Sequence, residues 1–243
     1  MEAAVVVPTL NERDNIEALL EGILMADPRL HAIIVDDGSA DGTAQLVTAL
    51  ADTHAARGTD RVHLIPRGRK LGYASAVQDG MRYALAHGAQ LVLQMDADFS
   101  HDPKYLPALL EKSQSYDLVI GSRYVRGGGT RNWGLERKFL SGGANALVRA
   151  LLRLPARDCT AGFRCWRREL IEKSGVLALK VEGYAFLFMT LERCYRVGAR
   201  IGEVPIIFVD RQYGKSKMSR RIVVEATRML IKTWLQARRA RKK

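Results

Sequence analysis

Two aspartates, Asp96 and Asp98, follow an apolar run at residues 91–93 that has the length of a buried strand. Carboxylates at the end of such a strand are costly unless a cation lies beside them. The Asp-x-Asp spacing directs both side chains to one face, and a turn can bring both to one ion. Carboxylate oxygens suit a hard cation such as Mg²⁺, which bridges to substrate phosphates. The spacing indicates a metal–diphosphate site, with helix capping or turn formation as the alternative.

Basic residues that can balance phosphate charge come later in the chain. Arg123, Arg131 and Arg137 flank the glycines of residues 127–129. Such a glycine run can close over a ligand, and an ordinary surface loop is the alternative. A solvated basic face is the alternative for the arginines.

The composition favours an anionic partner. The 243-residue chain has a net charge of +12 and a sequence pI near 9.9. Such a balance points to nucleotide, nucleic acid, lipid phosphate or an acidic membrane surface. The three cysteines show no zinc spacing, which fits a reducing compartment. Neither a signal peptide nor a membrane span is evident, so we expect a cytoplasmic protein, or one bound to a membrane face.

The elements that must position these residues follow a regular alternation. Short, uniformly apolar runs recur about every 30 residues with amphipathic helical segments between them, which predicts a parallel sheet covered on both faces. This is the doubly wound α/β class, in which ligands bind at the carboxyl ends of the strands. Neither a P-loop nor a Gly-x-Gly-x-x-Gly motif is present, so metal and basic side chains must hold any phosphate. The expected strands are residues 3–7, 32–35, 62–65, 91–95 and 118–120.

The second half of the chain is less regular. We expect a long helix from residue 135 or 136 to about residue 152, and a glycine-rich segment at 160–163 before another helix. Residues 204–209 predict an edge strand, because Pro205 cannot donate a ladder hydrogen bond.

Residues 219–243 predict a basic amphipathic helix that follows a catalytic domain of residues 1–218. Its apolar stripe contains Ile222, Ala226, Met229, Leu230 and Trp234. An anionic membrane surface suits this composition, and packing on the domain with a frayed basic tail is the alternative.

Several motifs, in order, resemble those of family-2 glycosyltransferases with a GT-A fold, and more closely dolichyl- or polyprenyl-phosphate mannosyltransferases. The resemblance spans about residues 5–219. Its motifs are VPTLNE at 7–12, VDDGS at 35–39, MDADFSHDP at 95–103, GSRY at 121–124, NW at 132–133 with Arg137 and Ser141, EVPI at 203–206, and FVDR at 208–211 with Gly214, Ser216 and Lys217.

The resemblance implies roles for individual residues. Asp96 and Asp98 would bind the diphosphate and a Mg²⁺ or Mn²⁺ ion, with Asp98 the direct ligand, and with Arg123 they form the catalytic set. Arg123, Arg137 and Ser141 would hold the acceptor phosphate. Leu10 stands where the family often has Tyr. The donor-binding set is Pro8, Leu10, Glu12, Val35, Asp37, Asp96, Ala97, Asp98, Arg123, Arg211 and Lys217.

The implied reaction is inverting transfer of mannose from GDP-mannose to a polyprenyl or dolichyl monophosphate on the cytoplasmic face of a membrane. A phosphate monoester is already anionic at pH 7, so the acceptor needs positive charge rather than a base. One alternative function has the same fold but uses UDP-glucose or UDP-N-acetylglucosamine as the sugar donor. The other is a basic nucleic-acid-binding protein, which we disfavour because only Trp234 interrupts the basic tail. The sequence identifies no membrane-protein partner.

Overall fold

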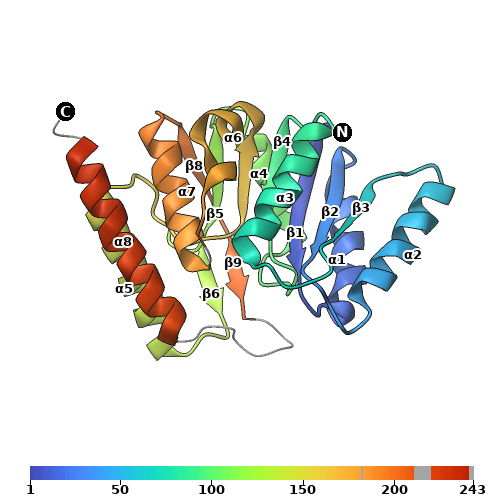
Figure 1. Cartoon of the computed structure of the whole chain (residues 1–243), viewed down its shortest axis with the longest axis horizontal. Coiled ribbons are helices and arrows are strands. Elements are labelled where there is room, and N and C mark those ends of the chain that lie inside the picture. Colours follow the sequence, from blue (N-terminus) through green and yellow to red (C-terminus); the bar gives the residue numbers. More distant parts are fainter. Residues whose placement is uncertain (182, 211–219, 241–243) are drawn as a thin grey trace.

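The computed structural model describes residues 1–181, 183–210 and 220–240, and its centre is a seven-stranded sheet (Figure 1). The strand order is β3-β2-β1-β4-β7-β5-β8, and β6 and β9 form a separate two-stranded sheet. The strands are β1 Ala3–Thr9, β2 Leu30–Asp36, β3 Val62–Pro66, β4 Leu91–Gln94, β5 Leu118–Ser122, β6 Gly129–Arg131, β7 Arg164–Arg167, β8 Ile201–Pro205 and β9 Ile207–Val209.

The predicted mostly parallel α/β sheet is confirmed, with β7 as the exception. β7 lies antiparallel between β4 and β5, so β4 and β5 point the same way. The sequence analysis missed β7 because polar Arg164 and Arg167 bracket only two apolar residues. A single edge strand over residues 204–209 was also wrong. β8 ends at Pro205, and the Ile206 carbonyl accepts a hydrogen bond from the Gly129 amide, so the chain passes to the second sheet.

Helices cover both faces of the sheet, because successive strand residues point to opposite sides. In β1, Ala4 and Val6 face α3, α6 and α7, whereas Val5 and Val7 face α1, α2 and α4. The helices are α1 Arg13–Ala26, α2 Thr43–Ala56, α3 Tyr73–Ala86, α4 Leu106–Lys112, α5 Leu135–Leu152, α6 Arg168–Ser174, α7 Tyr184–Arg196 and α8 Arg220–Ala240, with short 3₁₀ helices at Pro103–Tyr105 and Val176–Ala178.

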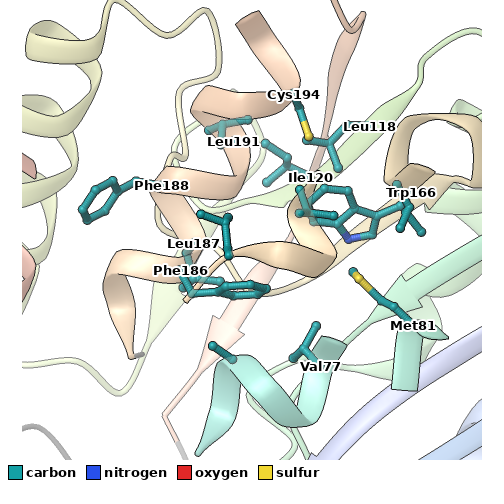
Figure 2. Close-up of a cluster of buried hydrophobic side chains, with 14 of the residues drawn as sticks. Val77, Met81, Leu118, Ile120, Trp166, Phe186, Leu187, Phe188, Leu191 and Cys194 are labelled. Carbon is teal, nitrogen blue, oxygen red and sulfur yellow. The ribbon is translucent and has the colours of Figure 1, made fainter. Parts of the chain in front are cut away.

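The core on one face joins the two halves of the chain. Figure 2 shows Trp166 of β7 and Phe186 of α7 lying over Val77 and Met81 of α3, and all four are fully buried. Burial of each such side chain contributes roughly 1.5–3 kcal/mol. This packing fixes α3 on the face of the sheet, with its first residue, Tyr73, at the end of β4.

The C-terminal helix α8 packs on the domain beside α5 and α7 (Figure 1). Leu230 is buried, and Ala226, Met229 and Trp234 are partly buried against the same core. Most of the stripe expected for a membrane therefore contacts protein, as the alternative interpretation held. Residues 241–243 of the basic tail and the side chain of Ile222 lie outside the description. Within the described ranges, no helix has the length and apolar character needed to cross a membrane.

Candidate active site

The predicted carboxylates and the first predicted arginine meet at one edge of the sheet. Asp96 and Asp98 follow β4, and Arg123 follows β5. Because both strands are antiparallel to β7, their carboxyl ends lie on the same side. That edge is where open α/β sheets bind ligands.

Asp96 is held from two sides and still reaches solvent. The Tyr73 hydroxyl donates to its Oδ1 at 3.2 Å, and the backbone N–H of Asp96 donates to His101 Nδ1 at 3.0 Å. Its side chain is nevertheless 36% exposed. A fixed and partly exposed carboxylate can receive a cation or a sugar hydroxyl.

Asp98 belongs to a tight turn. The amide and hydroxyl of Ser100 donate to its Oδ1 at 3.1 and 2.5 Å, Phe99 has a left-handed backbone with φ of 58°, and Ala97 is buried. The turn role considered for this residue is therefore real. It does not exclude binding, because a carboxylate has about four lone-pair sites.

His101 has a structural role beside Asp96. Burial lowers its pKa, and Nδ1 accepts the Asp96 amide, so the neutral ring carries its proton on Nε2. The ring stacks on Phe163 at 4.9 Å and meets the edge of Phe208 at 5.5 Å.

The second acidic pair, Asp36 and Asp37, is buried, and each carboxylate accepts several hydrogen bonds from the protein. Asp36 accepts from the amides of Gly38 and Ser39 and from the Ser39 hydroxyl, so it closes the turn after β2. Asp37 accepts from Arg67 at 2.9 Å and from the amides of Leu71 and Gly72 at 2.8 and 2.9 Å. The structure thus shows Asp37 holding the 67–72 loop, and its nucleotide contact stays a prediction.

Four of the remaining donor residues lie within β1 and β2 or just after β1. Pro8 and Val35 are register partners on these neighbouring strands. Leu10 and Glu12 lie in the turn before α1, where the Glu12 amide donates to Thr43 Oγ1 at 3.0 Å. Arg211 and Lys217 lie outside the described residues.

Arg123 is fixed by a buried acid that the sequence analysis missed. Its guanidinium donates to both oxygens of Asp158 at 2.7 Å and to Thr160 Oγ1 at 2.9 Å. Burial alone would raise the pKa of Asp158, but the hydrogen bonds and charge of Arg123 hold it below its usual value. Asp158 is positioned by Glu203, whose carboxylate accepts its backbone N–H at 3.0 Å.

The other two acceptor-phosphate residues lie on one helix, α5. Arg137 lies 4.3 Å from the ring centroid of Trp133 and pairs with Asp210 at 2.5 Å. Ser141, one turn later, lies 3.0 Å from the Tyr124 hydroxyl. Arg123 contacts the rings of both Trp133 and Tyr124, so the structure brings all three predicted residues together. Exposed Arg131 lies in β6 instead.

Aromatic rings connect the turn that carries Asp96 and Asp98 with the group of residues predicted to hold the acceptor phosphate. Phe208 contacts His101 at 5.5 Å, Trp133 at 5.4 Å and the Arg123 guanidinium at 5.6 Å. Phe208 and Trp133 occur in motifs that resemble the family, so a signal for them existed. Asp158 and Tyr73 gave no such signal, because their partners are more than 20 residues away in sequence.

The carboxylates fit a divalent cation that completes its shell with water and phosphate. Among the described residues no cluster of three or more His, Cys, Asp or Glu side chains could hold a metal by itself. Mg²⁺ characteristically uses one or two carboxylates together with substrate phosphates. Asp96 and Asp98, both partly exposed, match that donor set.

A family profile described as glycosyl transferase family 2 matches residues 4–175. The chain is 42% identical to the polyprenol monophosphomannose synthase of Mycolicibacterium smegmatis over 223 residues, or 91% of this chain and 83% of that one. It is 40% identical to the undecaprenyl-phosphate mannosyltransferase of Micrococcus luteus over 238 residues, or 98% and 96% of the two chains.

Solved structures show the same fold at lower identity. Glucosyl-3-phosphoglycerate synthase from Mycobacterium tuberculosis, in complex with Mn²⁺, UDP and glucosyl-3-phosphoglycerate, superposes with a TM-score of 0.65 at 20% identity. The match covers 97% of this chain and 79% of that one.

Proposed function

The chain belongs to glycosyl transferase family 2 and is a hexosyltransferase, and we propose that it transfers mannose from GDP-mannose to a polyprenyl monophosphate, releasing GDP. The two relatives at 40–42% identity bear the names of polyprenyl-phosphate mannosyltransferases. Membership in this family argues against the nucleic-acid-binding alternative.

One observation carries the acceptor assignment. Arg123, Arg137 and Ser141 gather around Trp133 and Tyr124, at the end of the sheet that also holds Asp96 and Asp98. Guanidinium groups suit phosphate because they present a planar fork of donors. The proposed acceptor phosphate would face this group, with Arg137 donating to it and Ser141 bonding a remaining oxygen.

The chemistry asked of the protein is mainly charge stabilisation. An acceptor phosphate oxygen attacks the anomeric carbon of mannose, the bond from that carbon to the GDP oxygen breaks, and the configuration inverts. A bound divalent ion would neutralise the departing diphosphate. Asp98 would hold that ion and Asp96 would bind it or the donor. A general base is unnecessary, because the phosphate is anionic at neutral pH.

A transfer assay with competing donors tests this proposal. The protein is incubated with Mg²⁺ or Mn²⁺, a short-chain polyprenyl phosphate and one labelled donor: GDP-mannose, UDP-glucose or UDP-N-acetylglucosamine. We expect label in the lipid phase only from GDP-mannose. Label from a UDP-sugar instead would overturn the donor assignment and retain the acceptor.

We also propose that the protein lies on an anionic membrane, on its cytoplasmic face, through α5. Leu135, Phe139, Leu140 and Leu147 are 71%, 79%, 63% and 52% exposed, and they form one stripe at helical spacing. Arg137 and Ser141 lie on the same helix, so a lipid-linked acceptor would reach its phosphate site from this surface.

Charge complements this apolar stripe. Lys138 and Arg149 are exposed on α5, and Arg228 and Lys232 are exposed on the adjacent α8. A helix with an apolar face and basic neighbours binds the interface of an anionic bilayer. The stripe on α5 replaces the covered stripe on α8 as the proposed apolar contact.

A further inference from the structure

Tyr73, the first residue of α3, places its hydroxyl between two residues of the β4 end. Gln94 Nε2 donates to the Tyr73 oxygen at 2.8 Å, and the hydroxyl lies 3.2 Å from Asp96 Oδ1. Gln94 is fully buried, and its Oε1 has no hydrogen-bond partner within the described part of the chain. The side-chain amide of Gln94 is therefore directed at the phenol.

The direction of the hydrogen bonds is fixed by chemistry. An ionised carboxylate only accepts, so the phenol must donate to Asp96 and use its lone pair for Gln94. A phenol keeps its proton up to a pH of about 10, so the Tyr73 hydroxyl is protonated at neutral pH. Tyr73 is a permanent donor to Asp96.

Gly162 leaves the space that this hydroxyl needs. A Cβ at residue 162 would lie 2.9 Å from the Tyr73 hydroxyl oxygen and 3.8 Å from Asp96 Oδ1. A contact of 2.9 Å is too close for a carbon against a fixed oxygen, so a side chain there would displace the phenol. The glycine, the phenol and the carboxylate form one packed unit.

We propose that Tyr73 is a positioning residue that holds the Asp96 carboxylate in the orientation that receives the metal-bound diphosphate. This inference rests on the proposed role of Asp96 in donor binding. Tyr73 reaches Asp96 through Oδ1, while the backbone of Asp96 is held separately by His101. Loss of the phenol oxygen would remove a contact that orients the carboxylate, without unfolding the turn.

Calorimetric titration of Mn²⁺ and GDP into the full chain tests the coupling. Tyr73→Phe should weaken GDP binding in the presence of Mn²⁺ by about 10-fold, the scale of one lost hydrogen bond to a charged group. In an Asp96→Ala background the same change should have no effect, because its target is gone. Equal weakening in both backgrounds, or no weakening at all, would overturn the proposal.

Tyr83→Phe is the matched control. Tyr83 lies on the same helix but packs against His63 and His87 instead. We expect unchanged GDP binding, and a loss equal to that of Tyr73→Phe would assign the effect to α3 as a whole.

A second pair of variants tests the packed unit by another route. Gly162→Ala should weaken GDP binding, and Tyr73→Phe/Gly162→Ala should be no weaker than Tyr73→Phe alone, because the clashing oxygen has been removed. Additive losses would contradict the proposal. Urea unfolding of each variant separates these effects from misfolding.

The transfer assay keeps this inference separate from the proposed function. A wild-type protein that binds GDP with Mn²⁺ but transfers no mannose would refute the proposed function, while the coupling between Tyr73 and Asp96 would still be measurable. Unchanged GDP affinity in Asp96→Ala would refute the positioning role itself.

Discussion

The donor end and the acceptor end of the site each contain one buried charged residue that makes several hydrogen bonds to the protein and one charged residue that is partly exposed. At the donor end, Asp37 is 8% exposed and its partner Arg67 only 4%, whereas Asp96 is 36% exposed. At the acceptor end, Arg123 is 8% exposed and bound to Asp158, whereas Arg137 is 42% exposed.

This difference distinguishes charged residues that hold the fold from charged residues that can contact a ligand. A charge whose hydrogen-bonding capacity is filled by protein stabilises the fold and has little left for a substrate. Asp37 and Arg123 shape the loops beside the site, and we expect Asp98 and Arg137 to contact the substrates.

Asp37→Ala should have the largest effect of these variants, and that effect is a loss of stability. The change removes the buried partner of Arg67 and the acceptor of the Leu71 and Gly72 amides, and it should lower the free energy of unfolding by about 3 kcal/mol. Asp79→Ala is the control, because Asp79 contacts the same arginine from a site that is 39% exposed and should cost less than about 1 kcal/mol. Urea unfolding measures both, and equal costs would contradict the division.

Asp98→Ala should leave the fold intact and reduce transfer by at least ~100-fold, the scale of losing a main charge-stabilising group. Steady-state transfer at saturating Mg²⁺ or Mn²⁺ measures the loss. The control is Asp102→Ala, which removes a carboxylate that caps a 3₁₀ helix and should keep most activity. Retention of most activity in Asp98→Ala would end its assignment as metal ligand.

Arg137→Ala should raise the KM for the polyprenyl phosphate about 10-fold, as expected for one hydrogen bond to a charged group. Binding of GDP should change little, because the contacts of Arg137 are with Trp133 and Asp210. Neighbouring Lys138→Ala, assayed with a soluble short-chain acceptor, is the control. A matching loss of GDP affinity, measured by calorimetry, would instead assign Arg137 to donor binding.

The exposed apolar stripe of α5 and the covered stripe of α8 differ in the same way. Substitutions on the exposed stripe should have the smallest effect, on membrane binding. Phe139→Glu on the exposed stripe of α5 should reduce binding to anionic vesicles roughly threefold to tenfold, and a loss should persist at high salt, where repulsion of the new charge is screened but the lost apolar contact is not. Met25→Glu, at an equally exposed apolar residue of α1, is the control.

Deletion of residues 238–243 should reduce vesicle binding only at low salt, because the attraction of basic residues is screened within roughly 10 Å at 0.1 M. Co-sedimentation at two salt concentrations compares the variants. If Phe139→Glu and Met25→Glu sediment alike, the membrane contact does not involve α5.

Local sequence patterns were sufficient for most of the architecture. Apolar runs predicted β1 to β5, and helical periodicity predicted α5 to within a residue, because both signals repeat along the chain. β7 and the division between β8 and β9 were missed, because strand pairing depends on partners distant in sequence.

The order of amino acids specifies which charges and apolar stripes the protein has, and which strands carry them to one edge of the sheet. Which of these groups are already bonded or covered depends on contacts made in the folded protein. Asp158 binds Arg123 from 35 residues away, and Arg67 binds Asp37 from 30 residues away. Likewise, the stripe of α8 is covered and that of α5 is not. Residue type sets what a side chain can bind. Burial and long-range partners set how much of its hydrogen-bonding capacity or apolar surface remains available to a ligand or a membrane.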